Sequence, residues 1–212
     1  MSKEQVFIAK GYSPWCNNNW KWKDKVANKF VSERVICKDI TNTGWMFRNC
    51  SNLILLDLSG FDTSDVIAMD GMFDGCENLT TLDLSNFDTS KLDSMWSMFL
   101  NCENLTSLDL SSFDTSKVKN MRSMFENCYN LTELDLSSFD TSKVENMRNM
   151  FWGCENLTTI KGIIDMKSCT KDKDYERMFT NCSKLKGVKI KNPPANFEKF
   201  SGLSSSQYTV VS

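Results

Sequence analysis

Nine cysteines in 212 residues are the first candidates for chemistry, because thiolates bind zinc and thiols form disulfides. From Cys50 to Cys154 five of them recur every 26 residues, and Cys182 follows after 28. No CxxC pair is present, and one thiol per repeat does not bring four ligands to one metal ion. We therefore predict reduced thiols that pack inside the protein, with no metal site and no cofactor. The sequence assigns no chemistry to the three cysteines outside this series, Cys16, Cys37 and Cys169.

Two rows of aspartates recur with the same period. The first row lies between pairs of leucines, so its carboxylates are expected to point outward from strands, and it comprises Asp57, Asp83, Asp109 and Asp135. A calcium site needs about 6–8 oxygens in a convergent cage, which a flat column supplies poorly. The row is kept as a candidate contact strip for a basic partner, with a merely solvated row as the alternative. The second row is expected to cap helices and comprises Asp62, Asp88, Asp114 and Asp140.

Each 26-residue copy is expected to contain a strand, a turn and a helix. Leu108 and Leu110 flank Asp109, which is the alternation of a half-buried strand. From Val118 to Cys128 the apolar residues are spaced by 3, 3, 1 and 3, which is typical of one face of a helix. An asparagine two residues after the cysteine is expected to end that helix in a left-handed turn. The Asn-Leu-Thr triplets at 78, 104, 130 and 156 match a glycosylation signal, but their period indicates that the repeat placed them there.

The LxxLxL core resembles the leucine-rich repeat. The longer pattern FDTSKVxxMxxMFxxCxNLTxLDLS is similar to the BspA-like repeats of bacterial surface proteins and of proteins carried on phages and mobile elements. This resemblance implies an α/β leucine-rich-repeat solenoid, with a parallel sheet on one face and short helices on the other. Where leucine-rich repeats commonly carry asparagine after the strand, this chain has phenylalanine, which predicts a stacked aromatic ladder in its place.

The chain divides into three parts on this basis. We predict an N-terminal cap at 1–30 with a short helix near 22–30, and a repeat array at 31–191 of about six coils, of which the first and the last are degenerate. Two residues are inserted around 162–172. A C-terminal cap at 192–212 follows, with strands expected at 188–190 and 208–211.

The differences between near-identical copies point to a contact surface. Tryptophan and arginine are the residues that most often anchor protein interfaces. At the variable positions we therefore predict a partner-binding patch that comprises Trp96, Leu100, Arg122, Arg148 and Trp152. The alternative is that these side chains cover the core between neighbouring coils.

The composition of the chain excludes or disfavours several classes of protein. The chain has no histidine, so the commonest general base and metal ligand is missing, and we expect no enzyme. A net charge of −2 gives no electrostatic argument for nucleic acid, and no apolar stretch predicts membrane insertion.

We expect a protein partner. The first interpretation is a binding scaffold. The alternatives are an intracellular inhibitor or effector encoded by a phage or mobile element, and a phage-tail or cell-surface adhesion component. The start of the chain lacks a signal-peptide pattern, which favours the cytoplasm, with a phage virion or the cell surface as alternatives.

Overall fold

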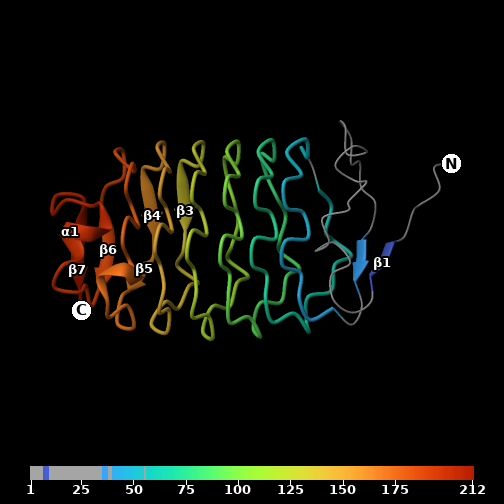
Figure 1. Cartoon of the computed structure of the whole chain (residues 1–212), viewed down its shortest axis with the longest axis horizontal. Helices are drawn as coiled ribbons and strands as arrows, with labels where there is room; N and C mark the ends of the chain where they lie inside the picture. Colours follow the sequence, from blue (N-terminus) through green and yellow to red (C-terminus); the bar gives the residue numbers. More distant parts are fainter. Residues whose placement is uncertain (1–6, 10–34, 38–39, 55) are drawn as a thin grey trace.

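The computed structural model describes residues 7–9, 35–37, 40–54 and 56–212. Along the repeat, successive segments wind as coils that lie side by side on the long axis of the molecule (Figure 1). The interior is filled by leucine, methionine, phenylalanine and cysteine side chains, one set from each coil. The helix predicted near 22–30 lies outside the described residues, as does almost all of the predicted N-terminal cap.

Within the described residues, three short parallel sheets take the place of the single array-long sheet that the sequence predicted. They pair β1 (Phe7–Ala9) with β2 (Val35–Cys37), β3 (Glu133–Asp135) with β4 (Thr159–Lys161), and β5 (Ile163–Asp165) with β6 (Val188–Lys191) and β7 (Tyr208–Val211). The strands predicted at 188–190 and 208–211 are confirmed as β6 and β7. Between the sheets, single parallel bridges join one position of successive coils, namely Asn42, Ala68, Ser94, Asn120 and Asn146.

The helix predicted from Val118 to Cys128 is wrong, because this segment forms consecutive turns. An α-helix uses its N–H groups for carbonyls four residues earlier. Here alternate N–H groups donate to the next coil instead: Ser123 N to Arg148 O at 2.9 Å, and Asn127 N to Trp152 O at 2.7 Å. Within the described residues the helices are η1 (Asp172–Asp174) and α1 (Phe197–Ser201).

Left-handed residues explain how these turns are built. The residue before the cysteine has a positive φ in every coil from the first described one, and it is always asparagine or glycine: Asn49, Gly75, Asn101, Asn127, Gly153 and Asn181. Both residue types tolerate this conformation at low cost. The left-handed turn thus comes before the cysteine, and its prediction two residues after the cysteine was wrong.

The second aspartate row caps turns rather than helices. The backbone N–H of Ser116 donates to Asp114 Oδ1 at 2.9 Å, and that of Ser142 donates to Asp140 Oδ1 at 3.0 Å. The backbone N–H of the aspartate does not join a helix either. That of Asp140 donates to Thr115 Oγ1 of the preceding coil at 2.8 Å. The aspartate side chains therefore cap backbone N–H groups as predicted, but these groups belong to turns and not to helices.

Stacked phenylalanines run through the core in two ladders, and the sequence predicted only the one that follows the strand positions. Centroids of Phe99 and Phe125 lie 5.7 Å apart, and those of Phe125 and Phe151 lie 5.6 Å apart, with nearly parallel rings. A second ladder stacks Phe113 on Phe139 at 6.4 Å. Since each ring packs against the coils on either side, no coil can bury its apolar side chains alone.

The C-terminal segment occupies the place of a further coil. The backbone N–H groups of Arg177 and Phe179 donate to carbonyls of α1, at Phe200 and Ser201, both at 2.7 Å. Phe197 is buried and meets the ring of Tyr208 edge-on at 5.2 Å. α1 and β7 therefore cover the last coil and accept its outward N–H groups (Figure 1).

The asparagine ladder before the cysteines predicts a stabilising substitution. Asn127 Nδ2 donates to Asn101 Oδ1 at 2.8 Å, whereas Asn127 Oδ1 is buried with no partner in the described part of the chain. The next coil has Gly153 at this position, with φ +79°, and a Cβ there would lie 2.6 Å from Asn127 Oδ1, so the Asn127 amide must turn to make room for a side chain. Gly153→Asn would supply the missing donor and remove a glycine from the unfolded chain, so we expect the free energy of unfolding to rise by about 0.5–1.5 kcal/mol.

Denaturant unfolding measures this gain, with Gly153→Ala as the control. Alanine brings no amide and adopts the left-handed conformation at a cost of about 1–2 kcal/mol, so this control should be less stable than the parent protein. An asparagine variant no more stable than the alanine variant would contradict the ladder argument.

Candidate functional site

The cysteine ladder is part of the core. From Cys76 onward each thiol of the ladder donates to a phenylalanine carbonyl of the preceding coil, as Cys102 Sγ does to Phe73 O at 3.3 Å and Cys154 Sγ does to Phe125 O at 3.1 Å. Burial raises the pKa of the Cys128 thiol to about 12, so this thiol stays protonated at neutral pH. The described residues contain no cluster of three or more side chains able to hold a metal ion. Cys16 and the side chain of Cys37 lie outside the described part.

In the first aspartate row, Asp83, Asp109 and Asp135 are exposed, and their carboxylates accept hydrogen bonds within the turn that follows them. The backbone N–H groups of Ser85, Ser111 and Ser137 donate to Oδ1 of the aspartate two residues earlier, at 2.9–3.0 Å. Hydrogen bonds from these serines lower the pKa of the aspartates Asp83, Asp109 and Asp135. Asp57 makes the same bond to Ser59 at 2.9 Å and is half-buried. Turn formation therefore accounts for these carboxylates without a ligand.

A second asparagine ladder explains the four glycosylation-like triplets. Asn104 Nδ2 donates to Glu77 O of the preceding coil at 2.9 Å, and Asn130 Nδ2 does the same to Glu103 O at 2.9 Å. Asn130 also donates to Asn104 Oδ1 at 3.2 Å. This asparagine ladder precedes the strand positions, whereas the phenylalanines follow them.

One row of exposed and half-buried side chains, which we call the exposed row, runs along the turn side of the coils. Backbone hydrogen bonds fix its register, since Ser97 N donates to Arg122 O and Ser123 N donates to Arg148 O, each at 2.9 Å. The row therefore holds, one residue per coil, Asp70, Trp96, Arg122, Arg148 and Glu176. Arg148 Nη2 pairs with Glu176 Oε2 at 3.0 Å.

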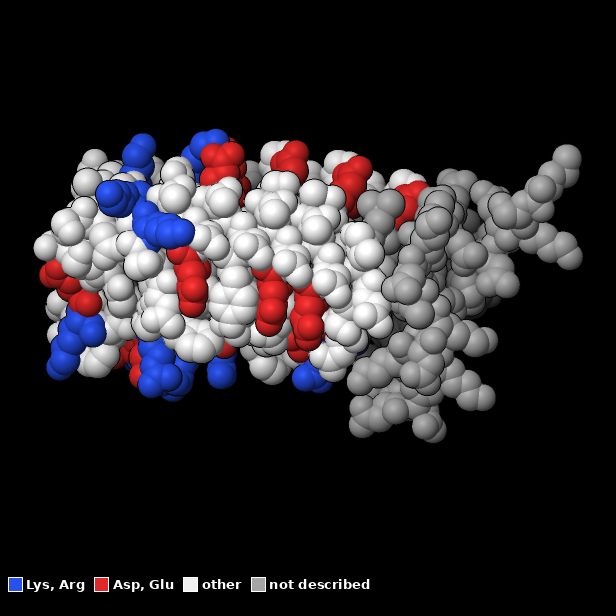
Figure 2. All heavy atoms as spheres, turned by 90° about the horizontal axis from the view of Figure 1, so that it is seen from above, with Lys and Arg blue, Asp and Glu red and all other residues white. Residues whose placement is uncertain are grey.

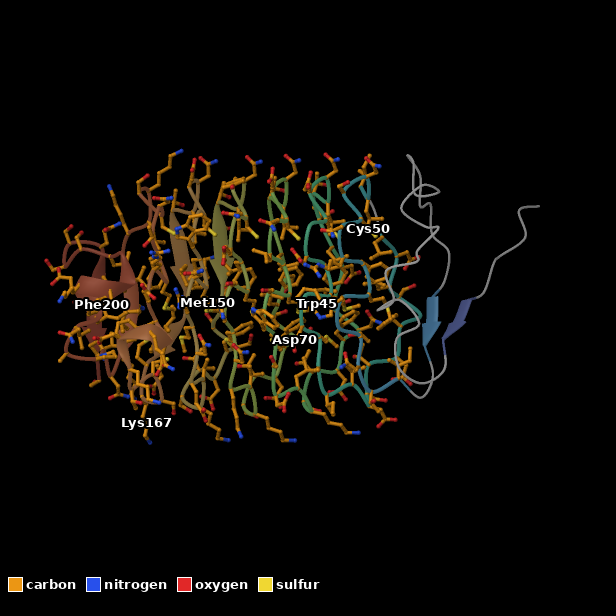
Figure 3. All side chains as sticks on the ribbon, viewed as in Figure 1. Trp45, Cys50, Asp70, Met150, Lys167 and Phe200 are labelled. Carbon is orange, nitrogen blue, oxygen red and sulfur yellow. The ribbon has the colours of Figure 1, made fainter. Side chains whose placement is uncertain are left out.

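The N-terminal end of this row carries a tryptophan cluster, which we define as Trp45, Trp96 and Arg48. The two indoles meet edge to face at 5.5 Å, and the Arg48 guanidinium lies 4.6 Å from the Trp45 ring centroid. Gly71 permits this arrangement, because a Cβ there would lie 2.0 Å from the Trp45 ring. Trp45 and Asp70 lie on adjacent coils, and the N–H of Trp45 donates to the carbonyl of Asp70 at 2.8 Å (Figure 3).

A buried carboxylate anchors this cluster. Asp74 has a side chain only 6% exposed and accepts a hydrogen bond from Arg48 Nε at 2.9 Å. Burial raises the pKa of Asp74, and the neighbouring Arg48 charge opposes that rise. The next coil has Leu100 in place of Asp74 and therefore has no carboxylate at this position. The ion pair between Arg48 and Asp74 holds the Arg48 guanidinium against the Trp45 ring.

The C-terminal end of the row opens into a basic cleft. This cavity has a volume of about 700 Å³ and is lined by the cations Arg122, Arg148, Lys167, Lys171 and Lys173, together with Glu145, Asn146, Ser168, Thr170 and Asp174. Figure 2 shows a different face, the one at the top of Figure 1 and away from Lys167; there, carboxylates follow the middle coils, and lysines and arginines lie toward the C-terminal end. Lys167 projects from the edge of this end in Figure 3.

The five residues predicted as one patch thus fall into separate groups. Trp96 belongs to the tryptophan cluster, and Arg122 and Arg148 line the basic cleft. Leu100 and Trp152 are half-buried and sit one turn further along their coils, so they partly cover the core. Sequence reasoning missed Trp45, Arg48 and the three lysines of the cleft. The signals were the glycine at 71 and the charged insertion near 170.

No helix in the described residues combines the length and the apolar character needed to cross a bilayer. Comparison with curated proteins and with solved structures found no match. A family model described as "Mycoplasma protein of unknown function, DUF285" matches residues 28–108 and 80–192, which together span most of the chain. The repeats fit the BspA-like type to which that family is assigned. The chain therefore belongs to the DUF285 family.

Proposed function

We propose that this protein is a non-catalytic protein-binding scaffold, built as a BspA-like leucine-rich-repeat solenoid, and that it binds through the exposed row on the turn side of its coils. The observation that carries this proposal is Trp96, which is 36% exposed in an array whose other large apolar side chains are mostly buried. An exposed indole beside arginines is the composition of an interface anchor. The functional positions are those at which the copies differ, because the shared positions are used by the core and the turns.

Support also comes from rigidity. Trp45, Gly71 and Arg48 hold the Trp96 indole in place through an edge-to-face contact and a cation–π contact. A side chain that is already ordered loses less conformational entropy when a partner binds. The cluster is therefore suited to recognition by a preformed surface.

A paired affinity capture tests the proposal. The intact protein and the variant Trp96→Ala/Trp152→Ala are used as baits in the same cell lysate, and captured proteins are quantified by mass spectrometry. We expect at least one abundant partner to be lost by the variant. The control is Ile54→Ala/Ile163→Ala, which truncates two apolar side chains that are 56% and 44% exposed and lie outside the row. The control should keep the partner.

Melting temperatures of all three proteins show whether the substitutions leave the fold intact. Equal recovery of every captured protein by the parent and the tryptophan variant would contradict the proposal. A fourth bait, Asp83→Asn/Asp109→Asn, tests the aspartate strip, and loss of the partner by this bait alone would move the binding surface to that strip.

A further inference from the structure

The basic cleft exists because the repeat is interrupted. Asp165 takes the place of Asp140, since the N–H of each donates to a threonine of the preceding coil. Asp174 takes the place of Asn146, since the carbonyl of each accepts an N–H from a methionine of the preceding coil. From Asp140 to Asn146 the chain advances 6 residues, and from Asp165 to Asp174 it advances 9, so the last coil has a loop that is 3 residues longer.

The longer loop forms one wall of the cleft. It contains η1 and carries Lys167, Lys171 and Lys173. The other lining cations are Arg122 and Arg148, which come from the two preceding coils. The cations therefore converge on one cavity from three successive coils, although the chain as a whole has a formal charge of −2.

Hydrogen bonding within the lining leaves a donor unused. Asp174 Oδ2 accepts the backbone N–H of Lys171 at 2.9 Å, and Arg148 Nη2 is paired with Glu176. Arg148 Nε, in contrast, is buried with no acceptor among the described residues. A buried donor without an acceptor is unfavourable, so the described residues satisfy the Arg148 guanidinium only in part, through its Nη2.

We propose that this cleft binds an acidic segment of the protein partner, in which several aspartate or glutamate carboxylates meet the cations. This inference rests on the proposed function and names the kind of partner. The cations are spread around about 700 Å³, which is more than a single compact anion fills. Glu145 and Asp174 also line the cavity and can accept N–H groups of a peptide backbone, which a simple inorganic anion does not offer.

A labelled oligoglutamate peptide is the probe, with oligoserine of equal length for comparison. Binding to the full chain is followed by fluorescence anisotropy at low and at near-physiological ionic strength. We expect oligoglutamate to bind and oligoserine not to bind. Lys171→Ala/Lys173→Ala should weaken binding about tenfold, from the loss of two partly screened charge pairs. Lys171→Arg/Lys173→Arg should restore it, because arginine keeps both charges and can form bidentate bonds.

The matched control is Lys186→Ala/Lys189→Ala, which removes the same charge from exposed positions outside the cleft. Its affinity should stay within about twofold of the parent, since distant exposed charges are screened by salt. Equal weakening by both double variants would mean nonspecific attraction to net charge and would overturn the proposal. Displacement of oligoglutamate by inorganic phosphate, with the total ionic strength held constant, would indicate a site for a compact anion and would also overturn the proposal.

The two proposals fail separately. If oligoglutamate does not bind while Trp96→Ala/Trp152→Ala still loses a captured partner, the cleft inference is wrong and the scaffold function stands. If oligoglutamate binds as expected but no bait variant changes the captured proteins, the cleft stands and the proposed contact row is wrong.

Discussion

Replacing Phe125 by alanine is expected to lower the free energy of unfolding by about 3–5 kcal/mol. The Phe125 side chain is fully buried and stacked between Phe99 and Phe151, with centroids 5.7 and 5.6 Å away. Truncation removes apolar contacts on both sides and leaves a cavity that the two rigid neighbouring coils cannot close. The loss therefore affects three coils at once. Phe113→Ala, in the second ladder, should have an effect in the same range.

Denaturant unfolding followed by circular dichroism measures both losses. The control is Ile54→Ala, in which the side chain is 56% exposed and should contribute less than about 1 kcal/mol. The dependence of the free energy on denaturant must be compared between variants, because long repeat arrays can lose two-state behaviour. Near-neutral results at both Phe113 and Phe125 would mean that the stacked core is wrong.

The period of the sequence predicted which side chains are buried better than it predicted the backbone. Val118, Met121 and Cys128 are all fully buried, as a helix face would require. Consecutive turns place side chains inward at nearly the same spacing, so periodicity does not distinguish the two. The recurrence of asparagine or glycine directly before the cysteine was the available signal, because these residue types adopt positive φ more readily than the others do.

The strand positions show a similar limit. Leu108 and Leu110 are buried and Asp109 is exposed, as the alternation predicted. A regular ladder of hydrogen bonds nevertheless forms in few coils, of which β3 and β4 are one pair. Alternation reports which way side chains point, whereas a strand also requires neighbouring backbones to pair over several residues. That second condition depends on how the coils stack, which sequence spacing does not specify.

The candidate site was found where copies could be compared and missed where they could not. Trp96, Arg122 and Arg148 stand at one position of well-aligned repeats, so their differences were visible. Trp45 lies in the degenerate first copy, and Lys171 lies in the longer loop of the last coil. Lys171 has no counterpart in the other copies, and Trp45 stands where the next two copies have Gly71 and Ser97, so both became informative only when contacts between coils were known.

Contacts between coils also decide the cost of replacing Gly162, and Gly162→Ala is expected to destabilise the protein by about 2–6 kcal/mol. Gly162 joins β4 to β5 with φ +94°, and a Cβ there would lie 2.7 Å from the carbonyl carbon and oxygen of Leu136. Backbone strain of this kind costs about 1–3 kcal/mol. Overpacking against atoms that cannot rotate away adds about 1–3 kcal/mol.

Gly187→Ala separates these two contributions. Gly187 has φ +67°, but a Cβ at this position would meet nothing within 4 Å. Its replacement should therefore cost only the left-handed conformation, about 1–2 kcal/mol. Denaturant unfolding of the two variants measures the difference, which reports the close approach of Gly162 to the preceding coil. Equal losses would mean that the coils can move apart at this point, and hence that the stacking distance is not fixed by backbone contact there.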